Sequence, residues 1–198
     1  MPKILKINKS SPYDLLYKYL DQAIIAKQHS IDAISISSFN KITNEVNSRF
    51  VNLKFIDDRD FIFFSNYNSM KAVEFESHSQ ISALIYWGSI NIQIRMQANI
   101  KKTPTNFSNQ YFAERSKEKN ALAISSNQSK KIESYEDVKK SYSSALHFSD
   151  LKKRPDYWGG YSFTPYSFEF WEGHESRLNI RNVYELKEGD WSNFLLEP

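Results

Sequence analysis

The chain has 198 residues, 26 of them basic and 23 acidic, and it contains no cysteine. The missing cysteines exclude disulfides, iron–sulfur clusters, Cys-ligated zinc and thiol nucleophiles, which fits a reducing cytoplasmic location. The net charge of +3 is spread along the chain, and no signal sequence or long apolar run is present, so neither nucleic acid nor a membrane is expected as a partner. We expect one domain over residues 1–198, with residues 1–10 as a flexible arm.

The first half of the chain predicts one helix followed by strands. Ser11 as N-cap, Pro12 in the first turn and Asp14 predict a helix over residues 12–28. Short β-rich runs then occupy residues 31–38, 46–56, 61–65 and 81–87, and a short helix lies in "SMKAVEFES". Residues 90–101 alternate apolar side chains with amides and cations, which predicts a strand with one buried face.

The second half predicts helices and then strands again. Residues 103–148 have helical patterns, and strand character returns at residues 157–163, 167–171 and 181–186 before a short tail. The whole pattern is typical of an α+β domain, a mainly antiparallel β-barrel of six to eight strands with peripheral helices.

Several kinds of site lack support in the sequence. The four histidines have no metal-ligand spacing, so we expect no metal centre. No G-x-G-x-x-G, Walker-type or G-x-S-x-G motif occurs, so any bound phosphate must be held mainly by side chains. Arg49, Lys54 and Lys71 are candidates, with Ser65 and Ser69 as further donors near a helix N-terminus. Taken alone, each of these cations is better explained as a solvated surface charge than as a site residue.

Six segments taken in order resemble the pyridoxamine 5'-phosphate oxidase family of flavoproteins. They are "SRFVNLK" (48–54), "FIFFSNYNSMKA" (61–72), "INIQIRM" (90–96), "QYFAERS" (110–116), "NQSKKI" (127–132) and "WGGYSFTPYSFEFWEGHESRLNIR" (158–181). The resemblance implies a split β-barrel homodimer that holds two FMN molecules at the subunit interface. It also implies oxidation of pyridoxamine or pyridoxine 5'-phosphate to pyridoxal 5'-phosphate, with O2 as electron acceptor and H2O2 as product.

The resemblance also assigns residues to the site. The phosphate of FMN would contact Arg49, Ser65 and Lys71, with Phe64 beside it and Met70 where the family usually has arginine. The flavin ring would contact the segment Phe50 to Lys54, which includes Val51, together with Gln93, and the partner subunit would add Gln128, Ser129, Trp171 and Arg181. The phosphorylated substrate would meet Lys54, Tyr111, Arg115 and Lys119, and Arg177 and Asn179 would act at its ring.

The chain departs from the family at positions that concern the substrate. Asn179 replaces a histidine, and an amide cannot change its protonation state near neutral pH. Lys119 replaces a serine, and the segment before Ser11 is short. The sequence therefore leaves open a paralogous FMN oxidoreductase that acts on another small molecule, as in the phenazine pathway, and an FMN-binding protein without turnover.

Aromatic residues and glycines of the last segment have predicted structural roles. We expect Trp158 in the core, and Gly159 and Gly160 at points of close backbone packing. Phe163, Phe168 and Phe170 offer aromatic surface for the dimer interface.

Overall fold

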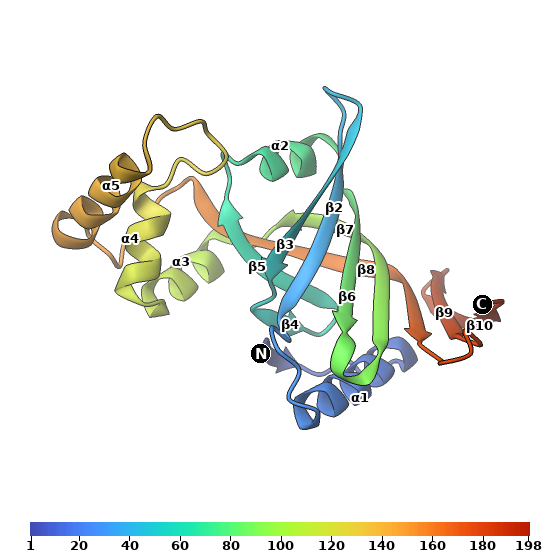
Figure 1. The fold of residues 1–198 in the computed structure, drawn as a ribbon. Helices are drawn as coiled ribbons and strands as arrows, with labels where there is room; N and C mark the ends of the chain where they lie inside the picture. The colour runs from blue at the N-terminus through green and yellow to red at the C-terminus, as the bar shows by residue number, and fades with distance from the viewer.

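Alternating apolar and polar residues build the barrel wall, and the helices lie outside it. The computed structural model describes residues 1–198 (Figure 1). The elements are β1 (Lys3–Lys6), α1 (Ser11–Ile25), β2 (Ala33–Asn40), β3 (Glu45–Asn52), β4 (Phe55–Asp57), β5 (Asp60–Asn66), α2 (Met70–Ser77), β6 (Gln80–Trp87), the 3-10 turn η1 (Gly88–Ile90), β7 (Ile92–Lys102), α3 (Thr105–Glu114), α4 (Lys117–Ser125), α5 (Tyr135–Phe148), β8 (Trp158–Glu172), β9 (Ile180–Lys187) and β10 (Asp190–Leu196).

The strands form one sheet in the order β1-β4-β5-β8-β7-β6-β2-β3, with β9 on β8 and β10 on β9. All pairs are antiparallel except β1 with β4. Strand β8 pairs with β7 along most of its length, whereas its first part pairs with β5 and its last part with β9. The sheet therefore splits along β8, which confirms the predicted mainly antiparallel split barrel with peripheral helices.

A bulge lets β8 continue past a proline. The pairing with β7 shifts register between Gln97 and Ala98, which lie opposite Ser167 and Pro165, so Tyr166 is the extra residue. A bulge tolerates proline because no regular ladder hydrogen bond is required there. The two strands predicted over residues 157–163 and 167–171 are consequently one strand.

Other element boundaries also differ from the predictions. Part of the expected N-terminal arm is strand β1, and the tail around Trp191 is strand β10. The run predicted over residues 46–56 divides into β3 and β4 where Leu53 turns inward and is 3% exposed. The structure therefore has ten strands, more than the six to eight expected.

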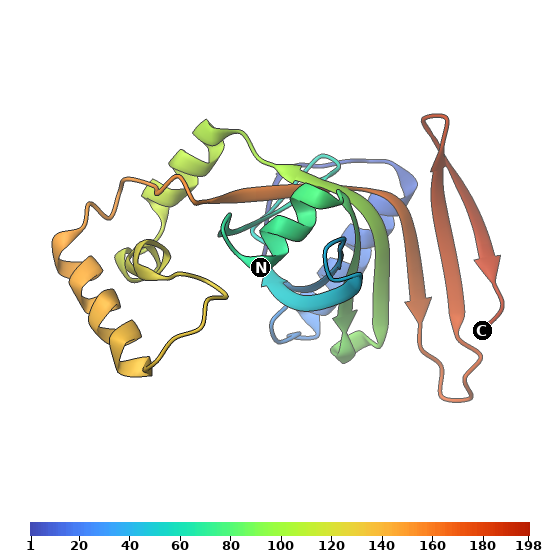
Figure 2. The ribbon, with the colours of Figure 1, turned by 90° about the horizontal axis from the view of Figure 1, so that it is seen from above.

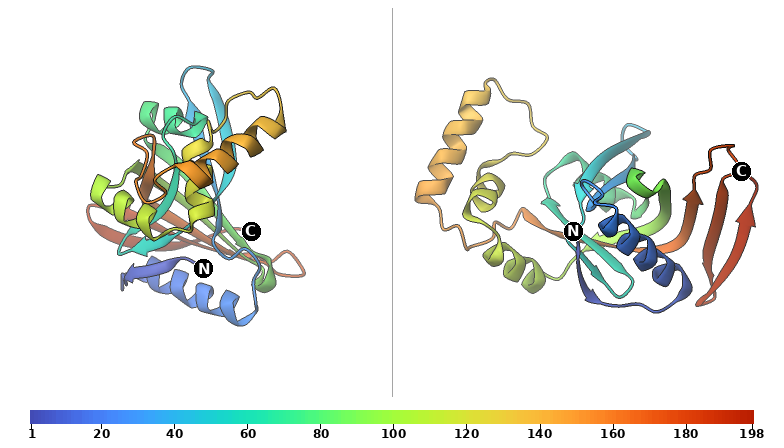
Figure 3. Two further views of the ribbon diagram at one scale, coloured as in Figure 1. Left: turned by 90° about the vertical axis from the view of Figure 1, so that its left-hand side faces the viewer. Right: turned by 60° about the horizontal axis from the view of Figure 1, so that its bottom comes forward.

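The barrel interior is filled by aromatic and branched side chains. Tyr13 and Leu16 of α1 belong to the same buried cluster as the barrel residues, and α1 covers one end of the barrel (Figure 3). Phe163, Phe168 and Phe170 are 0% exposed. The prediction that these three rings supply dimer surface is therefore wrong, because their side of β8 faces the core.

Helices α3, α4 and α5 lie together on one side of the barrel, opposite β9 and β10 (Figures 1 and 2). Phe112 of α3, Ala123 of α4 and Trp158 of β8 form a second, smaller buried cluster. Trp158 is 6% exposed, which confirms its predicted place in a core. No helix of the chain is long and apolar enough to cross a membrane.

Gly159 allows a tyrosine to pack against β8. A Cβ at this position would lie 2.1 Å from Oη of Tyr67, whose hydroxyl donates to the carbonyl of Gly160 over 3.1 Å. We expect Gly159→Ala to lower the free energy of unfolding by about 2 kcal/mol, because the tyrosine must move out of a packed position. Urea denaturation would measure the change.

Gly88→Ala is the matched control for this substitution. Its Cβ would lie 3.3 Å from the ring of Tyr86, which is 57% exposed and free to shift. Equal stability losses in the two variants would contradict the packing role assigned to Gly159.

Candidate functional site

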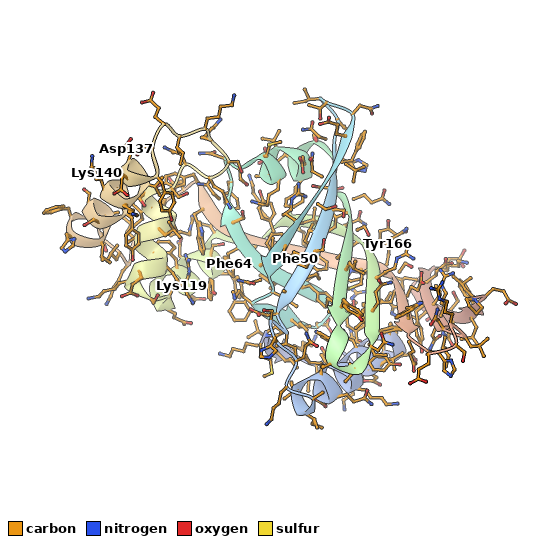
Figure 4. The ribbon with its side chains drawn as sticks, viewed as in Figure 1. Phe50, Phe64, Lys119, Asp137, Lys140 and Tyr166 are labelled. Carbon is orange, nitrogen blue, oxygen red and sulfur yellow. The ribbon has the colours of Figure 1, made fainter.

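A cavity of about 300 Å³ lies between the barrel and the helical side of the molecule. It is bounded by β3, β5, α3 and the segment after α4, and Figure 4 shows Phe50, Phe64 and Lys119 in this region. Many of the residues predicted for cofactor or substrate line it: Phe50, Val51, Lys54, Phe64, Ser65, Lys71, Tyr111, Arg115, Lys119 and Gln128. A second cavity of about 180 Å³ adjoins it and shares Phe64, Ser65, Arg115, Lys119, Gln128 and Trp158.

Lys71 is a buried cation without a carboxylate partner. It is 8% exposed, and its Nζ donates to the hydroxyls of Ser65 and Ser69 over 3.2 and 3.3 Å. Burial, and secondarily the charge of Arg49, lower its pKa, while Glu74 opposes the shift. The end of β5 and the first turn of α2 hold these groups together. An ammonium in this setting favours an incoming anion.

Arg49 lies close to the ammonium of Lys71, but its guanidinium already forms hydrogen bonds within the chain. Its guanidinium donates to a carboxylate oxygen of Glu74 over 2.7 Å, to the hydroxyl of Ser38 over 2.6 Å and to the carbonyl of Ile36 over 3.2 Å. The carboxylate of Glu74 is 0% exposed, and Asn47 also donates to it over 3.0 Å. Arg49 is absent from the lining of the cavity, so its predicted contact with the phosphate of FMN stays a prediction.

Met70 precedes Lys71 at the start of α2 and is 55% exposed. It is absent from the lining of the cavity. Its predicted place near the phosphate of FMN stays a prediction.

The far wall of the cavity is aromatic and carries a second cation. The ring of Phe64 stacks on Tyr111 with centroids 4.0 Å apart and on Trp158 with centroids 5.2 Å apart. The guanidinium of Arg115 lies 4.3 Å from the centroid of Trp158, and its Nη1 is buried without a hydrogen-bond partner. Burial lowers the pKa of Arg115. Tyr111 and Arg115 both line the cavity, as their four-residue spacing predicts.

Gln128 reaches the cavity from its own chain. Its Oε1 accepts hydrogen bonds from the hydroxyl of Ser65 over 3.2 Å and from the backbone N–H of Asn66 over 3.3 Å. The resemblance assigned this residue to the partner subunit, but here it needs no partner to contact Ser65. Ser129 follows with φ of 73° and is exposed outside the cavity.

Gln93, Trp171 and Arg181 form a separate row across β7, β8 and β9. Gln93 pairs with Trp171 and Trp171 with Arg181, so the three side chains emerge side by side on one face of the sheet. Nε of Arg181 donates to Glu169 over 2.8 Å, and Arg95 donates to the other oxygen of that carboxylate over 2.9 Å. None of these residues lines the cavity. One chain therefore divides the predicted flavin contacts into two groups.

Arg177 and Asn179 lie in the turn between β8 and β9. Arg177 is exposed and has φ of 61°, and its backbone N–H donates to the carbonyl of His174 over 2.9 Å. The side-chain oxygen of Asn179 accepts from the N–H of His174 over 3.0 Å. The asparagine thus closes the turn that presents Arg177. A role of either residue at a substrate stays a prediction.

Three residues near these groups escaped prediction from the sequence. Trp158 was expected in the core only, and it also lines the cavity. Asp32 forms an ion pair with Lys54, and Glu74 one with Arg49. Only for Glu74 did the sequence carry a signal of burial, because Glu74 shares the buried side of α2 with Ala72 and Phe75.

Known proteins resemble the chain along nearly its whole length. Residues 158–198 match the family described as "Pyridoxine 5'-phosphate oxidase C-terminal dimerisation region". The pyridoxine/pyridoxamine 5'-phosphate oxidase of Paraburkholderia phytofirmans is 32% identical over 191 residues, covering 95% of this chain and 89% of the relative. The protein of the same name from Rhodopirellula baltica is 29% identical over 200 residues, covering 96% and 86%.

Solved structures share the fold. PhzG from Burkholderia lata 383, in complex with tetrahydrophenazine-1-carboxylic acid, has a TM-score of 0.90 at 26% identity, over 96% of this chain and 93% of that one. A pyridoxamine 5'-phosphate oxidase-related, FMN binding protein from Nostoc punctiforme has a TM-score of 0.77 at 13% identity, over 96% and 99%. The second likeness bears on the fold alone.

Proposed function

Because the chain belongs to the pyridoxine/pyridoxamine 5'-phosphate oxidase family, we propose that it is an FMN-dependent oxidase of pyridoxamine and pyridoxine 5'-phosphate. The product would be pyridoxal 5'-phosphate, with O2 reduced to H2O2 and, for the amine, water consumed and ammonia released. The observation that carries the proposal is the buried ammonium of Lys71 between two hydroxyls in a cavity with a second cationic end.

The residues of the cavity fit FMN in their chemistry. Lys71 and Ser65 line the cavity and would supply a charged and a neutral donor for a phosphate, and Ser69, which accepts from Lys71, lies behind them. The unpartnered Nη1 of Arg115 is a buried donor that lacks an acceptor in the chain alone. A second anion, the phosphate of the substrate, would satisfy it.

FMN, when bound, would supply the two-electron chemistry that side chains lack. The chain's own residues would bind and orient the cofactor and the substrate. The aromatic wall of Phe64 and Tyr111 excludes water from the cavity, and Arg115 with Lys119 fixes the phosphorylated end of the substrate. Arg177 is held outward by the turn that Asn179 closes, where it would cover the substrate's ring.

A homodimer would bring the two groups of flavin contacts together. The match of residues 158–198 to a dimerisation region supports this assembly, because Trp171 and Arg181 lie in that segment. In the proposed dimer the row Gln93, Trp171 and Arg181 of one subunit lies over the cavity of the other.

The test begins with purified protein, which should take up one FMN per chain and show the absorption of oxidised flavin. Pyridoxamine 5'-phosphate in air should then yield pyridoxal 5'-phosphate and peroxide in equal amounts. A protein that binds no added FMN would contradict the proposed cofactor. Full FMN occupancy without formation of pyridoxal 5'-phosphate would contradict the proposed substrate.

A second candidate is an FMN oxidoreductase of a phenazine precursor. Its support is the likeness to PhzG at 26% identity, together with Asn179 where the family has histidine. Offering a partly reduced phenazine carboxylic acid and pyridoxamine 5'-phosphate to the same holoprotein would discriminate the two, since the better substrate gives the larger kcat/KM.

A further inference from the structure

One of the cations in the cavity is neutralised by an acid of the same chain. Nζ of Lys54 donates to a carboxylate oxygen of Asp32 over 3.1 Å, with the two side chains 33% and 23% exposed. Burial alone would raise the pKa of Asp32, but the hydrogen bond and charge of Lys54 outweigh it and lower the pKa. The carboxylate is therefore charged at neutral pH.

The other cations of the cavity have no such partner. Lys71 bonds to hydroxyls, Arg115 stacks on Trp158, and Lys119 forms no ion pair. Lys54 alone among the four lining cations is paired with a carboxylate. An acid beside a cavity that otherwise collects positive charge lowers the attraction for an anion at that wall.

The pair forms because the backbone places its two members at neighbouring strand ends. Asp32 precedes β2, and Lys54 lies in the short link between β3 and β4. The backbone N–H of Leu53 donates to the carbonyl of Asp32 over 2.8 Å, which holds the two segments together without the carboxylate. Replacing the side chain of Asp32 should therefore leave the local fold intact.

We propose that Asp32 is a specificity-determining residue that holds Lys54 away from the second ligand and so weakens binding of a doubly charged phosphate. A phosphate that reaches this wall must compete with the carboxylate for one ammonium. Ligands with a single negative charge, or none, lose less by this competition. The proposal rests on the proposed function for the identity of the second ligand, which is a phosphorylated pyridine.

The test compares two ligands that differ only in the phosphate. They are 4-deoxypyridoxine 5'-phosphate and 4-deoxypyridoxine, neither of which has the oxidisable 4' group. Calorimetric titration in saturating FMN measures both dissociation constants. We expect Asp32→Asn to tighten the phosphate ester about fivefold and to change the unphosphorylated ligand less than about twofold. High salt should reduce the gain, because the pair is partly exposed.

Two further variants make the result specific. In the Lys54→Met background the gain from Asp32→Asn should disappear, because the cation that it releases is gone. Asp137→Asn is the matched control, since Asp137 pairs with Lys140 on the remote helix α5 (Figure 4). It should change neither ligand's affinity.

The outcomes separate the inference from the proposed function. Equal tightening of both ligands, unchanged phosphate affinity, or no phosphate binding in Asp32→Asn would overturn the role of Asp32. Tighter phosphate binding without turnover of pyridoxamine 5'-phosphate would support that role and contradict the oxidase reaction instead.

Discussion

Lys71→Met is expected to weaken FMN binding about 100-fold while leaving the apoprotein at least as stable as the parent. The lost affinity follows from the removal of a buried, charge-assisted donor to the phosphate. The stability follows from the lowered pKa of Lys71, which shows that burial disfavours its charged form. Methionine fills a similar volume without a buried charge.

The pH dependence of apoprotein stability gives an independent readout. In the window between the lowered pKa of folded Lys71 and its ordinary value of 10.5, the unfolded chain binds more protons at this residue than the folded one. The contribution of Lys71 to the free energy of unfolding therefore rises with pH across that window. Lys71→Met should lack this rise.

Flavin fluorescence quenching measures the dissociation constant of FMN, and urea denaturation at several pH values measures stability. Lys41→Met, in the exposed turn between β2 and β3, is the matched control and should change neither. An apoprotein that unfolds more easily after Lys71→Met, with FMN affinity unchanged, would show that Lys71 is a structural lysine.

Glu74→Ala is expected to lower the free energy of unfolding by about 3 kcal/mol. The carboxylate is 0% exposed and accepts from Arg49, Asn47 and Ser38, so its removal leaves a guanidinium and two polar groups without their acceptor. Breaking a buried pair at one end is costly because the remaining charge stays poorly solvated. Glu74→Gln, which keeps an acceptor, should lose less.

Glu76 provides the control for this substitution on the same helix. Its carboxylate is 57% exposed and pairs with Lys102, which is 44% exposed, so Glu76→Ala should cost at most about 1 kcal/mol. If urea denaturation gave a comparable loss of unfolding free energy for Glu74→Ala and Glu76→Ala, the stabilising role assigned to the buried pair of Arg49 and Glu74 would be contradicted.

Local patterns in the sequence predict those parts of the fold that depend on period and composition. The alternation along residues 90–101 predicts Ile94 and Met96 in the core, where the structure has them at 0% and 1% exposure. Strand β8 was missed as one element because proline normally ends a strand, and only its pairing with β7 reveals the bulge at Tyr166. Phe163 and Phe168 both point into the core because the bulge between them shifts the register of β8.

The candidate site was predictable to the extent that it follows ordered motifs. The segments around Lys54, Phe64 and Arg115 converge on one cavity, as the resemblance implies. The acids that hold Lys54 and Arg49 were not predictable, because Asp32 and Glu74 lie 22 and 25 positions away from their partners and meet them only in the folded barrel. Sequence spacing carries no information on such a pairing.

Strand β8 also determines how the proposed site is divided between the two subunits of the dimer. Trp158 at its start lines the cavity and Trp171 near its end stands in the row with Arg181, separated by about 40 Å of extended backbone. In the proposed dimer each site would take its cavity from one copy and its row from the other. A copy damaged only at the cavity and a copy damaged only at the row would then still hold one undamaged site between them, so two defective alleles could complement each other.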